Sequence, residues 1–187
     1  MKKILSLVLA LAMMLCAFAP AMAEGALEGK LVILHTNDIH GRAVADAESF
    51  GYARIAQLKK NLQAQGAEVI LMDAGDFSQG TPLVNLGYGA NAITFMNAAG
   101  YDVVTLGNHE FDWGSDNMEQ NMANAKFAVV CANLTRAADG TTVFPANKIY
   151  ETAIGKVGVF GLDTPETMTK THPDKVKGIA FAQAEEL

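Results

Sequence analysis

The sequence predicts a layered α/β domain built around a largely parallel sheet. Short apolar runs alternate with amphipathic segments of helical period, a pattern typical of strands joined by crossover helices. Glycine-containing polar loops directly follow three of the apolar runs. About 164 residues follow the amino-terminal apolar segment, which is enough chain to bury the core of a single domain.

The first 23 residues have the pattern of a secretory signal peptide. Two lysines precede an almost unbroken apolar run over residues 4–18, and Ala21-Met22-Ala23 supplies small residues around a cleavage point. The run is short for a membrane-spanning helix, which needs about 20 apolar residues. We therefore expect cleavage after Ala23 and export to the periplasm, cell surface or exterior, with no stable membrane anchor and a mature domain over residues 24–187.

The composition indicates which kinds of partner the chain can bind and whether disulfides can stabilise its fold. Without residues 1–23 the chain has 12 basic and 20 acidic residues, a net charge of −8. An acidic chain gains little from releasing counterions on DNA or RNA, so we expect no nucleic acid polymer as a partner. Cys131 is the only cysteine after residue 23, which excludes an intramolecular disulfide, and the fold must rest on its core.

Hydrophobic period and helix-end residues give the order of the elements. Ile55, Leu58 and Leu62 fall on one face of a helix. Gly100 is a usual residue just past a helix end, and Ser115 is a typical helix cap. We expect strands over residues 30–35, 69–73, 103–106 and 127–131, helices over 51–65, 90–99 and 115–125, and a hairpin of residues 150–154 and 157–162 turning at Gly155-Lys156.

Polar side chains gather in the loops that follow the first three strands. Asp38 and His40 lie in the first loop, Asp76 in the second, and Asn108 and His109 in the third. Ligands of open α/β sheets bind outside the carboxyl ends of the strands, so these loops should converge. Asp38 and His40 are two residues apart, and an extended loop can point both side chains the same way. Oxygen ligands combined with imidazole suit zinc, manganese or iron better than calcium.

The remaining polar residues have simpler interpretations. A lone Asp-x-His pair is more often a hydrogen-bonded turn than a metal site, but three such loops at successive strand ends are hard to produce by chance. We expect His35 to be a core or near-core residue of its strand and His172 to be an exposed loop residue. Asp73 should brace the loop after its strand, and Glu110 should act at most indirectly.

The three loops also carry a family resemblance. The runs LHTNDIHGR (34–42), DAGDFSQGTPL (73–83) and TLGNHEFDWG (105–114) resemble the leading motifs of the calcineurin-like metallophosphoesterases, most closely the secreted 5′-nucleotidase and 2′,3′-cyclic phosphodiesterase group. The resemblance implies an α/β/β/α sandwich of which this chain supplies the first half. It also implies a hydrolase of phosphate esters, most of all nucleoside 5′-phosphates or related nucleotides, that uses two divalent metal ions (zinc, manganese or iron).

The resemblance implies a role for each motif residue. His109 would be the catalytic imidazole, oriented by Asp112, three residues further along the chain. Four residues would bind metal: Asp38 and His40 on one ion, Asp76 bridging both ions, and Asn108 on the second.

One feature departs from the family pattern. The family completes its site with a later histidine and a Gly-His-x-His motif, and the four histidines of this chain form no such motif. We therefore expect this chain to stop before the site is complete, and the isolated polypeptide to bind divalent metal weakly and to turn over substrate poorly. A Gly-His-x-His motif further along the reading frame would support a complete enzyme.

Two alternatives remain open. A thiosulfohydrolase of the same fold could share the leading motifs. A non-catalytic exported module could keep the fold, and one metal, as a binding surface. The complete set of leading motif residues argues against the second alternative, whereas the missing later motif argues for it.

Overall fold

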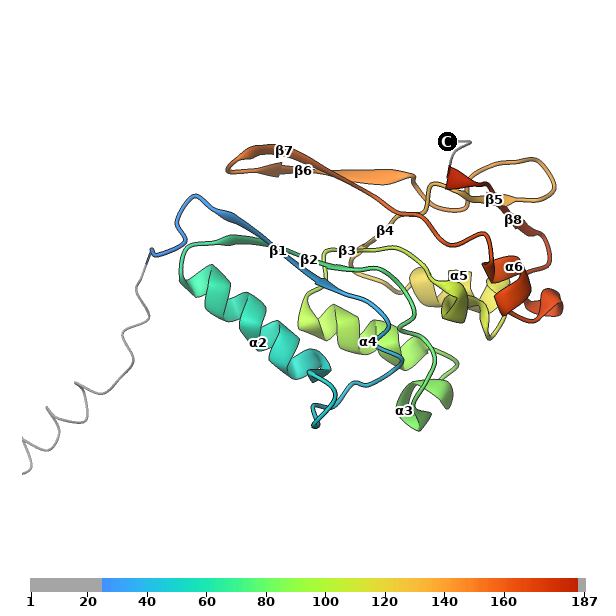
Figure 1. Ribbon diagram of the computed structural model, residues 1–187, viewed down its shortest axis with the longest axis horizontal. Coiled ribbons are helices and arrows are strands. Elements are labelled where there is room, and N and C mark those ends of the chain that lie inside the picture. The colour runs from blue at the N-terminus through green and yellow to red at the C-terminus, as the bar shows by residue number, and fades with distance from the viewer. Residues whose placement is uncertain (1–24, 185–187) are drawn as a thin grey trace, which may run out of the picture.

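The computed structural model describes residues 25–184, so the predicted signal peptide lies outside the described residues. A four-stranded parallel sheet forms the centre, with helices on one face and a strand hairpin over the other (Figure 1). In chain order the elements are β1 (Leu31–Thr36), α2 (Gly51–Ala64), β2 (Glu68–Asp73), α3 (Pro82–Asn85), α4 (Ala90–Ala99), β3 (Val103–Val104), η1 (Asn108–Phe111), α5 (Ser115–Met122), β4 (Ala128–Val129), β5 (Leu134–Arg136), β6 (Asn147–Thr152), β7 (Gly155–Phe160), α6 (Thr167–Lys170), η2 (Pro173–Lys175) and β8 (Ile179–Phe181).

The sheet brings the ends of its strands to a common edge. Its order is β1-β2-β3-β4, and each neighbouring pair is parallel. Thr36 at the end of β1 pairs with Asp73 at the end of β2, which pairs in turn with Val104 at the end of β3. The loops that follow these three strands therefore start side by side, as the sequence pattern predicts.

The main core lies between the sheet and the helices. Apolar side chains from the helices pack against the buried side chains of β2 and β3, because each helix keeps an apolar stripe toward the sheet. This packing fixes the inner ends of the three polar loops. The buried residues include Leu71 and Val104 of the sheet, Ile55 of α2, Ile93 and Met96 of α4, and Met118 and Met122 of α5.

The hairpin of β6 and β7 covers part of the opposite face of the sheet (Figure 1). Tyr150 and Val159 pack against buried residues of the sheet, and the Tyr150 hydroxyl donates a hydrogen bond to the carbonyl of Asp102 at 3.0 Å. Ile149 and Phe160 are 58% and 69% exposed. The hairpin therefore has one apolar face against the sheet and another in solvent.

Three local predictions are corrected. The hairpin turns at residues 153–154, and Gly155 already begins β7 opposite Thr152. The residue that precedes α5 is Gly114, and Ser115 makes no capping hydrogen bond. His35 is exposed, because Leu34 points toward the helical core and the neighbouring residues of a strand point to the opposite face.

The predicted fold class is confirmed. The parallel sheet, its helical layer and the strands above its other face correspond to the first half of the predicted sandwich. Cys131 is buried and free. Within residues 25–184, no helix combines the length and the apolar character needed to cross a membrane.

Candidate metal centre

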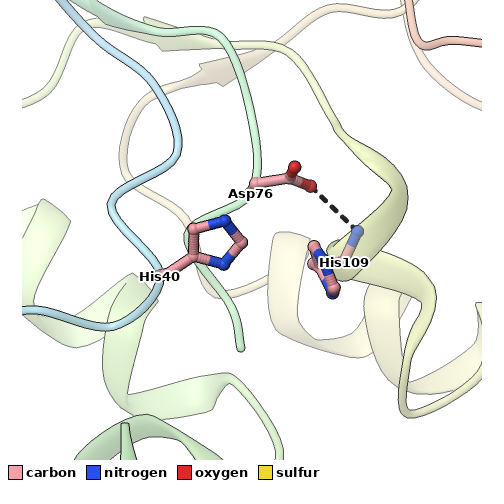
Figure 2. A group of neighbouring side chains, drawn as sticks. All are labelled: His40, Asp76 and His109. Atoms are coloured by element: carbon pink, nitrogen blue, oxygen red, sulfur yellow. Dashed lines mark hydrogen bonds between the residues drawn. The ribbon is translucent and has the colours of Figure 1, made fainter. Parts of the chain in front are cut away.

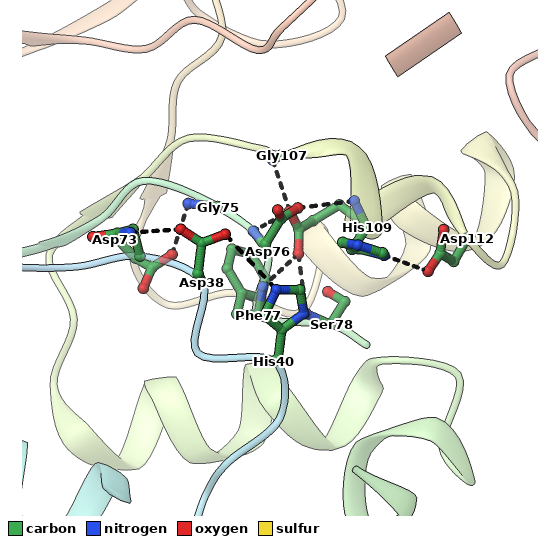
Figure 3. Close-up of polar contacts among 12 residues, drawn as sticks. Asp38, His40, Asp73, Gly75, Asp76, Phe77, Ser78, Gly107, His109 and Asp112 are labelled. Atoms are coloured by element: carbon green, nitrogen blue, oxygen red, sulfur yellow. Dashed lines mark hydrogen bonds and ion pairs between the residues drawn. The ribbon is translucent and has the colours of Figure 1, made fainter. Parts of the chain in front are cut away.

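The loop after β1 is held against the loop after β2 by the main chain. The amide of Asp38 donates to the carbonyl of Gly75 at 3.0 Å, and the amide of His40 donates to the carbonyl of Asp76 at 2.9 Å. These two bonds turn Asp38 and His40 toward Asp76, whose own carboxylate faces the third loop (Figure 3).

The predicted extended loop is wrong in its backbone geometry. Asp38, His40 and Asp76 have φ angles of 51°, 48° and 62°, all in the left-handed region that non-glycine residues rarely adopt. The side chains converge nonetheless, because His40 Nε2 lies 3.7 Å from Asp38 Oδ1. Strained backbone held by surrounding bonds is concentrated at functional sites, and three predicted ligands show it here.

The third loop approaches Asp76 through a glycine. The amide of His109 donates to Asp76 Oδ1 at 2.9 Å. A Cβ atom at Gly107 would overlap that same oxygen. Only a residue without a side chain therefore lets the turn before η1 lie against the Asp76 carboxylate.

Three side chains meet at this edge of the sheet, one from each loop (Figure 2). One possible ligand atom from each of His40, Asp76 and His109 lies within 4.8 Å of the others, and all three residues are partly buried. The rings of the two histidines are 5.0 Å apart at 74°. Two imidazoles and a carboxylate form a donor set that suits zinc, manganese or iron.

Among the predicted site residues, His109 stands out because it occupies this cluster although its predicted role is catalytic. Its Nδ1 lies 2.8 Å from Asp112 Oδ2. Burial lowers the pKa of His109, but the hydrogen bond and charge of Asp112, together with the charges of Asp76 and Glu110, outweigh it and raise the pKa above the ordinary value. Its ring therefore keeps a proton more readily than a free histidine does.

Asn108 opens η1 and is held from a distant part of the chain. Its carbonyl accepts a hydrogen bond from Thr171 Oγ1 at 2.9 Å, and Thr171 is buried. Sequence reasoning did not identify Thr171, because it lies 63 residues away in a loop-rich segment without a motif. Its contact with η1 exists only in the folded chain.

Two further buried acids support the loops. Asp73 braces its loop as predicted, since its Oδ1 accepts the amide of Gly75 at 2.8 Å, and burial raises its pKa to about 7. Glu110 is 1% exposed, and its carboxylate accepts amide hydrogen bonds from residues 76–78 and from Gly107. This indirect role agrees with the prediction for Glu110, but the sequence did not reveal its four amide partners.

A cavity of about 460 Å³ lies beside the cluster. Asp38 and His40 line one side, and Arg42, Glu48 and the exposed ring of Phe50 line another. Its size is within the range of small-molecule sites.

Known proteins resemble this chain in sequence and in fold. The 5′-nucleotidase of Vibrio cholerae serotype O1 is 34% identical over 192 residues, covering 100% of this chain and 35% of its own length. A snake venom 5′-nucleotidase of Gloydius brevicauda is 35% identical over 171 residues, covering 83% and 29%. A solved 5′-nucleotidase precursor from Thermus thermophilus matches with a TM-score of 0.69 and 29% identity, over 82% of this chain and 32% of that one.

A second solved structure, the sulfate thiohydrolase SoxB of Thermus thermophilus, matches with a TM-score of 0.74 over 84% of this chain and 40% of its own. Its identity of 18% shows the shared fold alone. The chain spans about a third of the length of the curated relatives it matches. The profile of the calcineurin-like phosphoesterases matches residues 31–184, nearly all of the described chain. The chain therefore belongs to the calcineurin-like phosphoesterase family.

Proposed function

We propose that this chain carries the leading metal-binding loops of an exported phosphoesterase that hydrolyses nucleoside 5′-phosphates or related nucleotides. The observation that carries the proposal is the meeting of His40, Asp76 and His109 from three separate loops. Family membership and relatives that are 5′-nucleotidases support the reaction class and the substrate.

The charges around the cluster fit a bound cation. Burial raises the pKa of Glu110, and repulsion by the negative charge of Asp76 acts in the same direction. Asp38 adds a third carboxylate beside His40. A divalent cation between these loops would offset the repulsion, whereas a neutral ligand would not.

Asp38 and His40 would hold one ion, Asp76 would bridge two, and Asn108 would reach the second. When bound, two divalent ions would activate a water and polarise the phosphoryl oxygens. The bridging place suits Asp76, because one of its oxygens already faces the amide of His109 while its carboxylate lies among all three loops.

His109 would act on the phosphoryl group of the substrate. Asp112 engages its Nδ1, so Nε2 is the nitrogen that can donate a proton to the leaving oxygen or a hydrogen bond to a phosphoryl oxygen. Its raised pKa favours the protonated ring that either step requires. Binding a metal through Nε2 would exclude this role, so metal stoichiometry separates the two assignments.

The proposed function is tested in the protein expressed from its whole reading frame, by removing metal with a chelator and restoring Mn²⁺ or Zn²⁺ while inorganic phosphate release from AMP is measured. We expect release that requires metal and is lost in Asp76→Asn. A sulfur ester assayed in parallel covers the thiosulfohydrolase alternative. Phosphate release that persists with chelator, or hydrolysis of the sulfur ester alone, would contradict the proposal.

The proposed export rests on residues 1–23, which lie outside the described residues. Amino-terminal sequencing of secreted protein should give Glu24 as the first residue. A membrane-bound product that keeps Met1 would show that the segment is an anchor.

A further inference from the structure

The Glu110 carboxylate joins the two loops that carry Asp76 and His109. One oxygen, Oε2, accepts the amides of Asp76 at 2.8 Å and Gly107 at 2.7 Å. The other, Oε1, accepts the amides of Phe77 at 2.9 Å and Ser78 at 3.0 Å. Figure 3 shows these amide donors converging from the second and third loops.

Four hydrogen-bond donors occupy all the acceptor positions of the Glu110 carboxylate. An ionised carboxylate offers about four acceptor positions and no donor. Glu110 is 1% exposed, so each of these bonds replaces water that cannot reach the group. An amide left unpaired in such a place loses a hydrogen bond that water cannot replace, which makes the arrangement sensitive to the loss of a single oxygen.

We propose that Glu110 is a positioning residue that sets the spacing between Asp76 and the turn before His109 before any metal arrives. It spans loops 33 residues apart in the sequence, and its two oxygens accept main-chain amides from both of them. One oxygen of Glu110, Oε2, accepts the amides of both Asp76 and Gly107 and so holds the two backbones together. The bond from the His109 amide to Asp76 Oδ1 then follows from that spacing.

The proposal rests on the proposed function only in its expected consequence for metal affinity. A glutamine at this position keeps the shape but presents one acceptor oxygen and one NH₂ donor group. Two of the four amides then face a donor, and the loops move apart. Groups that orient metal ligands typically contribute about 10- to 100-fold to metal affinity, so Glu110→Gln should weaken Mn²⁺ binding by about that factor.

A matched control is available at the residue that precedes β3. Asp102 Oδ2 accepts the amide of Leu71 at 2.7 Å and a hydrogen bond from Lys59 Nζ at 2.6 Å. Asp102→Asn therefore also removes a carboxylate that binds a main-chain amide, but one outside the three loops of the cluster. We expect it to lower the melting temperature while leaving Mn²⁺ affinity within about twofold of the wild type.

The first experiment compares Mn²⁺ affinity by titration calorimetry for the wild type, Glu110→Gln and Asp102→Asn, at a temperature where all three are folded. Hydrogen exchange of the His109 amide in metal-free protein is the second reading. Glu110 does not bond this amide, so its faster exchange in Glu110→Gln reports movement of the loop. Unchanged Mn²⁺ affinity and unchanged His109 exchange, with only a lower melting temperature, would overturn the proposal.

Two further outcomes remain decisive. If Glu110→Gln does not fold, exchange in the wild type alone is informative: the amides of residues 76–78 and Gly107 should exchange as slowly in metal-free protein as those of β2. Rapid exchange there would overturn the proposal. If the wild type binds no Mn²⁺, the proposed function fails, whereas His109 exchange still decides whether Glu110 positions the loops.

Discussion

His109 combines a position inside the three-loop cluster with a carboxylate partner on its Nδ1 nitrogen. The distance of 2.8 Å between Nδ1 and Asp112 Oδ2 fixes the ring of His109 in η1 against the residue that follows η1, three positions along the chain. This contact leaves Nε2 as the chemically active nitrogen. A role in proton donation and a role in holding metal make different predictions for substitutions.

In the protein expressed from its whole reading frame, His109→Asn should leave metal content near that of the wild type and lower kcat for a phosphate monoester by about 10²–10⁴-fold, as expected for a general acid. Asp112→Asn should have a smaller effect, because it weakens the orientation and charge of the imidazole without removing it. Metal analysis beside steady-state kinetics measures both. Metal loss in His109→Asn with metal retained in Asp76→Asn would reverse the assignment of ligand and catalyst.

Asp163 is a buried acid that the proposed chemistry does not use. It is 3% exposed, Thr167 Oγ1 donates to its Oδ1 at 3.0 Å, and burial raises its pKa to about 8. The folded protein therefore keeps this proton over a pH range in which the unfolded chain has released it. The free energy of unfolding should fall as pH rises from about 4 to about 8.

Asp163→Asn removes this titration while keeping the shape of the protonated acid. In metal-free protein we expect the free energy of unfolding of the variant to equal that of the wild type near pH 4. As pH rises, the variant should become more stable than the wild type, by at most about 1.4 kcal/mol per pH unit. Urea unfolding at several pH values measures the difference. Parallel curves for the two proteins across this range would show that Asp163 does not titrate there.

At the scale of elements, close backbone approach joins the three loops. Gly107 has an extended backbone, with φ −116° and ψ −175°, so alanine can adopt its conformation. The difficulty for alanine is steric, because the added Cβ would overlap Asp76 Oδ1. The turn and the carboxylate therefore form one unit in which neither can move alone.

Gly107→Ala should lower Mn²⁺ affinity by at least about tenfold, because the Cβ displaces the proposed bridging carboxylate. Gly158→Ala in β7 is the matched control, since a Cβ there meets nothing within 4 Å. It should change the free energy of unfolding by no more than about 0.5 kcal/mol and leave affinity unchanged. Equal Mn²⁺ affinities for the two variants would mean that Asp76 tolerates the displacement.

At the scale of the whole molecule, one face of the β6–β7 hairpin remains apolar and exposed. Asn147 pairs with Phe160 and Ile149 with Gly158, so Ile149 and Phe160 are diagonal neighbours on the same side. The other side carries Tyr150, which packs against the sheet. Exposed apolar pairs of this kind favour self-association.

A variant that combines Phe160→Ser and Ile149→Thr should bind less of the dye ANS and show less concentration-dependent association, with little change in melting temperature. Both side chains are more than half exposed, so little buried area is lost. Leu86→Ser is the control, because Leu86 is 84% exposed in the loop after α3. An equal reduction in the control would show that the hairpin face has no special part in association. Light scattering and dye fluorescence measure the two effects.

The sequence alone determined the four strands of the sheet, the helices α2, α4 and α5, the β6–β7 hairpin and the residues that lie at the strand ends, whereas the short elements α3, η1, β5, α6, η2 and β8 were not predicted. Apolar runs and helical period are local properties, and parallel strands necessarily share an edge, so the meeting of the loops after β1, β2 and β3 followed directly. The motifs within those loops were sufficient to identify the family to which the chain belongs. Local period also placed α4 correctly from Ala90 to Ala99.

Only the tertiary structure decided how those loops are held. The left-handed backbone of Asp38 and His40 depends on bonds to the second loop, and the four amides on Glu110 come from loops that meet only after the sheet forms. Exposure of His35 likewise depends on which face of β1 the rest of the chain covers. A sequence pattern indicates which residues share a face of an element or a loop. The residue that each of them contacts in another segment is set by how distant segments pack.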